Sequence, residues 1–271
     1  PALRCVVGGV RTVEIRTEGV HSGAASGIVP SSFRILRQIL DRIEDSRTGA
    51  ILPRDFHVEI PPERLAEARE VAKVLGTEIY DRFPFAPGAR PVGTDPYELI
   101  LNNTWRPTLS IIGAAGMPLP ADGGNVLRPQ TSLKLSVRIP PTCDAGRAVR
   151  KLKEIVEADP PYGARVTMNT YGDAGNGWNA PAPDPKLLES IQRASATYFG
   201  KPAMFAGLGG SIPFMSMLGE RFPQAQFVIT GAMGPGSNAH GPNEFLHLPT
   251  GVRVTACVAQ IVAEHSARSQ K

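Results

Sequence analysis

The sequence predicts an α+β protein in two parts: a two-layer domain with a largely antiparallel sheet, followed by a part of α/β type. First, strand-like alternation and amphipathic helices follow one another in the order strand, helix, strand, strand, helix, strand. Second, a loop rich in Gly, Pro, Asn and Asp changes the composition near residues 172–184. Third, helices alternate with short apolar runs after that loop, as they do in α/β domains.

The first half of the N-terminal domain begins with strand. Residues 3–19 predict one long strand or two short ones, because Val13 and Ile15 alternate with polar residues between positions 12 and 16. Residues 31–46 place apolar side chains at helical spacing after serines that can cap a helix. Residues 61–76 begin with proline and end with glycine, which predicts a second helix. The chain from there to Pro107 reads as irregular.

The second half of this domain repeats strand and helix. Residues 108–116 and 131–141 predict strands, and the second of these alternates cleanly between apolar and polar side chains. Residues 144–158 predict a helix capped by its first residue, an aspartate, and residues 164–171 predict a closing strand. We therefore expect the first domain to span residues 1–171.

The second part, residues 172–271, holds too few strands to close a sheet alone. We therefore expect residues preceding Pro1 to supply the remaining strands. Its predicted helices cover residues 184–200 and 250–268, with another after the turn at 208–213, and its predicted strands cover residues 202–207 and 225–230.

Composition excludes several classes of function. The net charge is only +4 over 271 residues, and the basic residues form no blocks, so we expect no nucleic-acid partner. No apolar run approaches the roughly 20 residues of a membrane-spanning helix. The three cysteines are an odd number without CxxC spacing, which predicts no disulfide framework and a reducing compartment, the cytoplasm.

The five histidines fall into two groups. His57, His247 and His265 lie in strand-like or helical surroundings and are interpreted as structural or surface residues. His21 and His240 lie in glycine-flanked loops, where functional groups are often displayed.

The surroundings of His240 leave two interpretations open. Glu244 follows four residues later, a spacing at which both side chains can share one helix face and bind zinc. Gly241 and Pro242 argue against a continuous helix, and a catalytic zinc needs three protein ligands, which do not occur nearby. From the residues alone, His240 is either a single ligand or a loop histidine satisfied by its neighbours.

Two further positions suggest anion binding. Gly209 and Gly210 would let backbone N–H groups approach an anion, with Ser211 capping the next helix. The alternative is an ordinary glycine turn with a cap. Arg138 ends the polar face of a predicted strand, where a guanidinium either grips a carboxylate or is simply solvated.

Taken in order, the segments "VHSGAASGIVP", "LKLSVRIPP", "GGSIPF" and "SNAHGPNEF" resemble the M20 family of zinc metallopeptidases, most nearly its carnosinase-like dipeptidases. The resemblance implies a ferredoxin-like lid, or dimerisation, domain over residues 1–171. Residues 172–271 would then be the C-terminal part of an incomplete α/β catalytic domain. It also implies a hydrolase that cleaves small peptides, binds two zinc ions and forms a homodimer through the lid.

The resemblance also implies roles for the loop histidines. His240 would be a zinc ligand, whose partners and general base lie in the N-terminal half of the catalytic domain, outside this chain. This chain alone would therefore hold no zinc pair and be inactive. His21 would reach across the dimer to polarise the scissile carbonyl in the partner's site.

The substrate-binding residues implied by the resemblance come from both parts of the chain. Arg138 would bind the substrate's C-terminal carboxylate, and Ser211, with Gly210 in the same loop, would contact the same end. Asn125 matches a polar lid position that contacts substrate, although we would expect threonine there.

Two alternatives remain. An N-acyl-amino-acid deacylase or desuccinylase of the same family would use the same lid histidine and arginine. A dimerising or binding module without catalysis would keep them for another purpose.

Overall fold

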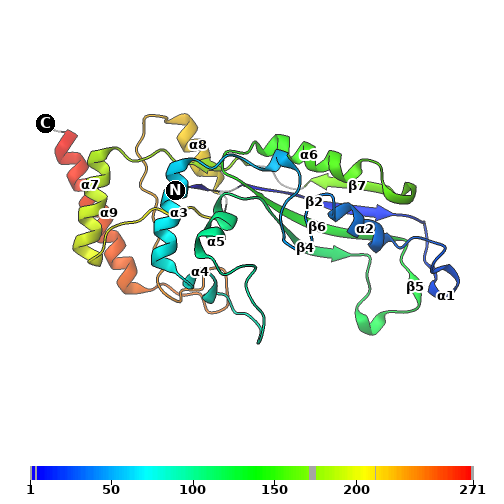
Figure 1. Ribbon diagram of the computed structural model, residues 1–271. Helices are drawn as coiled ribbons and strands as arrows, with labels where there is room; N and C mark the ends of the chain where they lie inside the picture. Colours follow the sequence, from blue (N-terminus) through cyan, green and yellow to red (C-terminus); the bar gives the residue numbers. More distant parts are fainter. Residues whose placement is uncertain (1, 4, 171–174, 211, 270–271) are drawn as a thin grey trace.

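A four-stranded antiparallel sheet organises the N-terminal part of the computed structural model (Figure 1), which describes the chain except Pro1, Arg4, residues 171–174, Ser211 and residues 270–271. The order across the sheet is β4-β6-β2-β7, and all neighbours are antiparallel. The strands are β2 (Cys5–Glu14), β4 (Thr108–Ala115), β6 (Gln130–Ile139) and β7 (Arg165–Thr170).

Two helices cover one face of this sheet, α2 (Ser32–Leu40) between the first two strands and α6 (Ala145–Glu157) before the last. The resulting order β2-α2-β4-β6-α6-β7 is the ferredoxin-like arrangement, so the predicted fold class is confirmed. Asp144 caps α6 by accepting a hydrogen bond from the Arg147 N–H. Helix α2 ends at Leu40, earlier than expected, although Ile43 beyond it is still fully buried.

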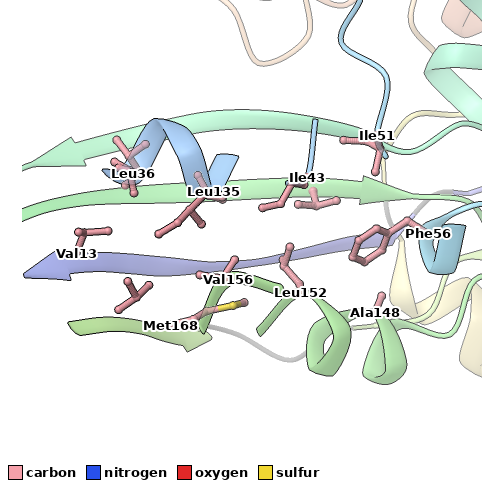
Figure 2. Close-up of a cluster of buried hydrophobic side chains, with 14 of the residues drawn as sticks. Val13, Leu36, Ile43, Ile51, Phe56, Leu135, Ala148, Leu152, Val156 and Met168 are labelled. Atoms are coloured by element: carbon pink, nitrogen blue, oxygen red, sulfur yellow. The ribbon is translucent and has the colours of Figure 1, made fainter. Parts of the chain in front are cut away.

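The core lies between the helices and the sheet (Figure 2). Side chains from β2, β6 and β7 meet those of α2 and α6 there, and the cluster extends to Phe56 at the end where α6 begins. Alternate residues of β6 point into this layer, which is why its sequence alternates. The β6 side chains in the cluster are Leu133, Leu135, Val137 and Ile139.

The segment between α2 and β4 contains three α-helices. The first was predicted, but the other two lie between Gly76 and Pro107, so the expectation that this stretch is irregular is wrong. Asp95 caps α5 by accepting the Tyr97 N–H, and Pro96 occupies the first helical turn. Helices α3 and α5 pack together through a second cluster that includes Val71, Leu101 and Trp105. The helices are α3 (Pro62–Leu75), α4 (Glu78–Asp81) and α5 (Pro96–Thr104).

Arg64 on α3 ties this helical segment to the C-terminal part. Its guanidinium is almost fully buried and donates hydrogen bonds to Asn179 Oδ1 (2.9 Å) and to the Ala180 carbonyl (2.6 Å). It also forms an ion pair with Glu67 at 2.7 Å. The helical segment therefore lies against the chain that leaves the sheet domain, as Figure 1 shows.

Among the described residues, the C-terminal part consists of helices, irregular chain and one two-residue strand at its start. The predicted strands at 202–207 and 225–230 do not form, because a strand needs a hydrogen-bonding partner and neither segment pairs with another in the described chain. Helices α7 and α9 pack side by side. The helices are α7 (Pro185–Phe199), α8 (Pro213–Arg221) and α9 (Leu248–Ser269).

Two small sheets complete the fold. The pair β1 (Ala2–Leu3) and β8 (Trp178–Asn179) joins the start of the chain to the segment that follows the sheet domain. The pair β3 (Val20–His21) and β5 (Val126–Leu127) forms a tip beyond the four-stranded sheet (Figure 1). None of the described helices is long and apolar enough to cross a bilayer.

Candidate functional site

His21 lies at the tip, as the last residue of β3 and the N-cap of the short helix α1 (Ser22–Ala25). Its Nδ1 accepts a hydrogen bond from the Gly23 N–H at 3.1 Å, and its side chain is exposed. Because Nδ1 is an acceptor, the neutral ring carries its proton on Nε2. The cap therefore leaves His21 with a hydrogen-bond donor directed away from the backbone.

Asn125 belongs to the same tip. Its carbonyl accepts the Ser22 N–H at 2.8 Å, and the next residue, Val126, pairs with His21 across the β3–β5 sheet. The Arg16 guanidinium holds this strand pair by donating a hydrogen bond to the Leu127 carbonyl at 3.0 Å. The structure thus brings two of the predicted site residues, His21 and Asn125, into one exposed cluster.

Arg138 lies at the other end of the sheet. It is half-buried near the end of β6, opposite Thr108 of β4, whereas Gln130 begins β6 at the end of the sheet nearest the tip. Eight residues separate Gln130 from Arg138, which at about 3.4 Å per residue in a strand is ~27 Å. The tip and Arg138 therefore cannot contact one small molecule within a single chain.

The glycine loop, defined here as residues 207–210, lies against helix α5. Gly210 is exposed, and a methyl group added to it would meet nothing within 4 Å. A methyl group added to Gly209 would lie 2.9 Å from Nδ2 of Asn103 and 3.0 Å from its Oδ1. Ser211, predicted to contact substrate, lies outside the described residues.

His240 is displayed by a loop that is hydrogen-bonded within itself. Its φ is +61°, and Asn238 and Asn243 also have positive φ, a conformation that costs free energy for residues other than glycine. The Asn238 side chain donates to the Pro242 carbonyl at 2.7 Å. Glu244 accepts the backbone N–H of His240 at 3.0 Å, so this carboxylate shapes the loop and the imidazole stays exposed.

The described residues of this chain do not fit a zinc site by themselves. No group of three or more His, Cys, Asp or Glu side chains gathers in the described part of the chain. The Glu244 carboxylate beside His240 is engaged with the backbone, so it is not directed at a shared ion. The donor set offers one imidazole where a catalytic zinc needs three protein ligands.

Neither cysteine whose side chain is described suits nucleophilic catalysis. Cys143 is buried and Cys257 is half-buried, and both are free thiols. Burial raises the pKa of each thiol, which disfavours the reactive thiolate. The chemistry of these loops therefore depends on histidine, arginine and backbone N–H groups.

Sequence reasoning missed Asn103 as a candidate site residue. The contact between Asn103 and Gly209 joins positions 106 residues apart, and no local pattern carries it. The Asp95-Pro96 start of helix α5 was a signal that the segment is ordered. Recognising that helix would have placed Asn103 in its last turn.

Known proteins resemble this chain in sequence and in structure. It is 25% identical over 235 residues to a cysteinylglycine-S-conjugate dipeptidase of Corynebacterium striatum, which covers 83% of this chain and 47% of that protein. The dipeptidase Dug1p of Saccharomyces cerevisiae superposes with a TM-score of 0.74 at 20% identity, over 97% of this chain and 55% of that one. Human carnosine dipeptidase 1 gives a TM-score of 0.67 at 19% identity, with the same coverage.

These comparisons fix the family and the extent of the match. The chain spans about half the length of the relatives it matches, and the structural likenesses show a shared fold. Residues 8–164, more than half of the chain, match the peptidase dimerisation domain of the M20 family. This chain is a member of the M20 metallopeptidase family and contains its dimerisation domain.

Proposed function

We propose that the complete protein is a homodimeric metal-dependent dipeptidase whose active site is shared between two copies of the chain. The observation that carries this proposal is the ~27 Å between the start of β6 near the tip and Arg138. A dipeptide reaches about 7 Å. His21 and Arg138 can therefore serve one substrate only if they come from different copies.

Each described residue has a role that its geometry supports. Arg138 binds the C-terminal carboxylate of the substrate through its guanidinium, and the N–H groups of the glycine loop at Gly210 approach the same end. We propose a contact with that end for Ser211 as well, although it lies outside the described residues. His21 of the partner subunit donates its Nε2–H to the carbonyl oxygen of the scissile bond as negative charge develops there. Asn125 lies beside His21 and contacts the substrate from the same side.

We assign His240 as one ligand of the metal site. The strained loop that holds its imidazole exposed supports this assignment, and the remaining ligands and the general base are supplied from outside the described residues. The 271-residue chain on its own is therefore expected to be inactive, and zinc is the metal we expect. We also expect a cytoplasmic location, in keeping with the free cysteines.

The free edge of the sheet is the surface we propose for the dimer. Strand β4 is one of the two edge strands of the sheet, the other being β7, and it exposes Ile111 and Ile112, which are 51% and 55% accessible. An edge strand with unpaired backbone groups and apolar side chains readily pairs with another strand. A second copy of the lid would cover this edge and extend the sheet.

The names of the relatives support dipeptides as the substrate class, since the curated relative and both solved structures are named as dipeptidases. An N-acyl-amino-acid hydrolase would need the same arginine for the carboxylate. The rates on dipeptides and on N-acyl amino acids, measured with the protein from the complete gene, separate the two. Deacylation without dipeptide cleavage would replace the dipeptidase assignment.

Complementation between two inactive variants tests the shared site. His21→Ala and Arg138→Ala are purified separately, mixed in equal amounts and allowed to exchange subunits. Random exchange makes half of the dimers mixed, each with one intact site, so we expect about a quarter of the wild-type activity. Mixing without recovery, while wild-type subunits do exchange, would place both residues in one chain's own site and overturn the shared arrangement.

A further inference from the structure

We propose that Asn103 is a positioning residue that holds the glycine loop in the conformation that binds the substrate's carboxylate. The proposal rests on the dipeptidase function above, because it assigns this loop to the carboxylate end of the substrate. The proposal adds Asn103 to the residues that form the carboxylate-binding site. No other residue of the helical segment between α2 and β4 has been assigned to that site.

Gly209 lies so near Asn103 that any side chain at position 209 would collide with it. All three atoms nearest to a methyl group added at Gly209 belong to Asn103, namely Nδ2 at 2.9 Å, the carbonyl oxygen at 3.0 Å and Oδ1 at 3.0 Å. Real Cβ atoms rarely come within 3.4 Å of another heavy atom. The loop backbone can rest on Asn103 only because residue 209 has no side chain.

Helix α5 gives Asn103 a firm support. Leu101 and Trp105, two residues before and after it, pack in the cluster with α3 and are only 2% and 3% exposed. Thr104 donates its hydroxyl to the Ile100 carbonyl at 2.7 Å within the last turn. Asn103 itself is exposed, and its side-chain amide lies beside Gly209 while the buried residues around it fix its backbone.

The chain preceding the glycine loop packs on the same support. Residues 205–207 line a gap of about 10 Å³ together with side chains of α3 and α5, among them Arg64, Val71 and Ile100. A gap of this size holds at most one water molecule. The start of the loop is therefore fixed on the helices, and Asn103 contacts it where it turns out toward solvent.

The same helix also leads to Arg138. Helix α5 ends at Thr104, and four residues later Thr108 of β4 lies opposite Arg138 in the sheet. One short stretch of chain thus carries both the residue that contacts the glycine loop and the strand position beside the arginine. Preorganised donors bind an anion better than donors that must first be ordered, so this support is expected to set carboxylate affinity.

The first test compares two neighbouring asparagines. In the protein from the complete gene, Asn103→Ala should raise KM for a dipeptide about 10-fold and change kcat less than about threefold, because ground-state and transition-state binding weaken together. Asn102→Ala is the matched control: Asn102 accepts a hydrogen bond from Arg106 at 2.9 Å and supplies none of the three atoms nearest to a methyl group at Gly209, so the KM of this variant should stay unchanged. Equal effects of both variants on KM would overturn the proposal.

A charge test separates positioning of an anion site from simple packing. Asn103→Asp keeps the shape of the side chain but brings a negative charge beside the glycine loop. It should raise KM for a dipeptide more than Asn103→Ala does, and this excess should disappear for the same dipeptide with its carboxylate converted to an amide. An excess that persists with the amide would place the carboxylate elsewhere.

A double-mutant cycle tests the contact itself. Gly209→Ala should raise KM strongly, and part of that loss should be recovered in the Asn103→Ala background, because two of the three close contacts belong to the Asn103 side chain. If the effects of the two substitutions on KM are additive, the residues act independently and the proposed role of Asn103 is wrong.

Hydrogen exchange on the 271-residue chain distinguishes failure of this inference from failure of the proposed function, since it needs no activity. Backbone amides of residues 205–210 should exchange faster in Asn103→Ala and remain unchanged in Asn102→Ala. Faster exchange, combined with no peptide cleavage by the protein from the complete gene, would retain the positioning role and remove the dipeptidase function. Unchanged exchange would remove the positioning role whatever the activity.

Discussion

The four-stranded sheet domain and the C-terminal part of the chain differ sharply in how completely they are packed. In the sheet domain, helices α2 and α6 seal one face, and many core side chains have no exposed surface. In the C-terminal part, the packed cluster of α7 and α9 includes only three buried residues, Leu187, Ala194 and Ile261. Large apolar side chains such as Leu208, Phe214 and Val262 remain exposed there.

The difference shows that a local sequence pattern is enough to form a helix but not enough to form a strand. Helices α7 and α9 form because the backbone hydrogen bonds of a helix lie within it, and they pack because their apolar faces meet each other. The segments 202–207 and 225–230 carry strand-like sequences yet stay outside any sheet in the described chain. A strand is completed by its neighbour, so its sequence alone does not secure it.

The sharpest test of this comparison uses two leucines on helices. Leu152→Ala on α6 removes a fully buried side chain and should lower the free energy of unfolding by about 3–5 kcal/mol. Leu188→Ala on α7, where the side chain is 37% exposed, should cost about 1 kcal/mol or less. Urea denaturation of both variants checks this, and equal losses would mean that the two parts are equally packed.

Arg64 tests whether the two regions unfold together. Arg64→Met keeps the aliphatic stem but removes the hydrogen bonds to Asn179 and Ala180 and the ion pair with Glu67, which should cost about 2–3 kcal/mol. We expect thermal unfolding of this variant to show two transitions where the unaltered chain shows one, because the helical segment and the C-terminal part would no longer unfold together. Lys73→Met on the same helix, whose ion pair with Glu70 is exposed, is the control and should change stability by less than about 0.5 kcal/mol.

A smaller, pH-dependent effect is expected where α7 meets α9. The hydrogen bond from Arg193, together with those from Ser190 and Gln260, lowers the pKa of Glu264 from 4.5 to about 2. As the pH falls, the unfolded chain takes up this proton first, so the stabilisation is present above pH 4.5 and is lost toward pH 2. Because Arg193 is half-exposed, Glu264→Gln should cost no more than about 1 kcal/mol at pH 7.

The control for that experiment is Glu189→Gln. Glu189 is 71% exposed and pairs with the same arginine at 3.4 Å, so it should change stability little at any pH. Thermal unfolding from pH 7 to pH 3 checks both variants. A Glu264→Gln defect that stayed constant down to pH 3 would remove the ion pair as its cause.

Much of the sheet domain could be predicted from the sequence because its signals are local. The cap at Asp144 and the alternation along β6 predict their elements within a few residues. Helix α5 was missed because it is short, although Asp95 and Pro96 mark its start. The strands at 202–207 and 225–230 are predicted but do not form in the described chain, because an apolar strand pattern carries no information on whether a neighbouring strand is present to pair with it.

The candidate site was less predictable than the fold for a similar reason. Loop position alone singled out His21 and His240, but it did not reveal that Nδ1 of His21 is occupied by the Gly23 N–H. Nor did it reveal that Arg138 lies far from the tip, since that distance follows from the strand register. Contacts such as that of Asn103 with Gly209 depend on the whole tertiary arrangement.

The pairing of β1 with β8 brings together the two ends of the long segment that lies between these strands. Leu3 and Trp178 lie opposite each other as the last pair of an antiparallel ladder, so a two-residue turn such as Asn-Gly would join them directly. The chain between them, which includes the sheet domain and the helical segment anchored by Arg64, therefore starts and ends at this one strand pair. Domains with adjacent ends can be exchanged or deleted as units, which makes this strand pair a natural place to graft a lid of different length.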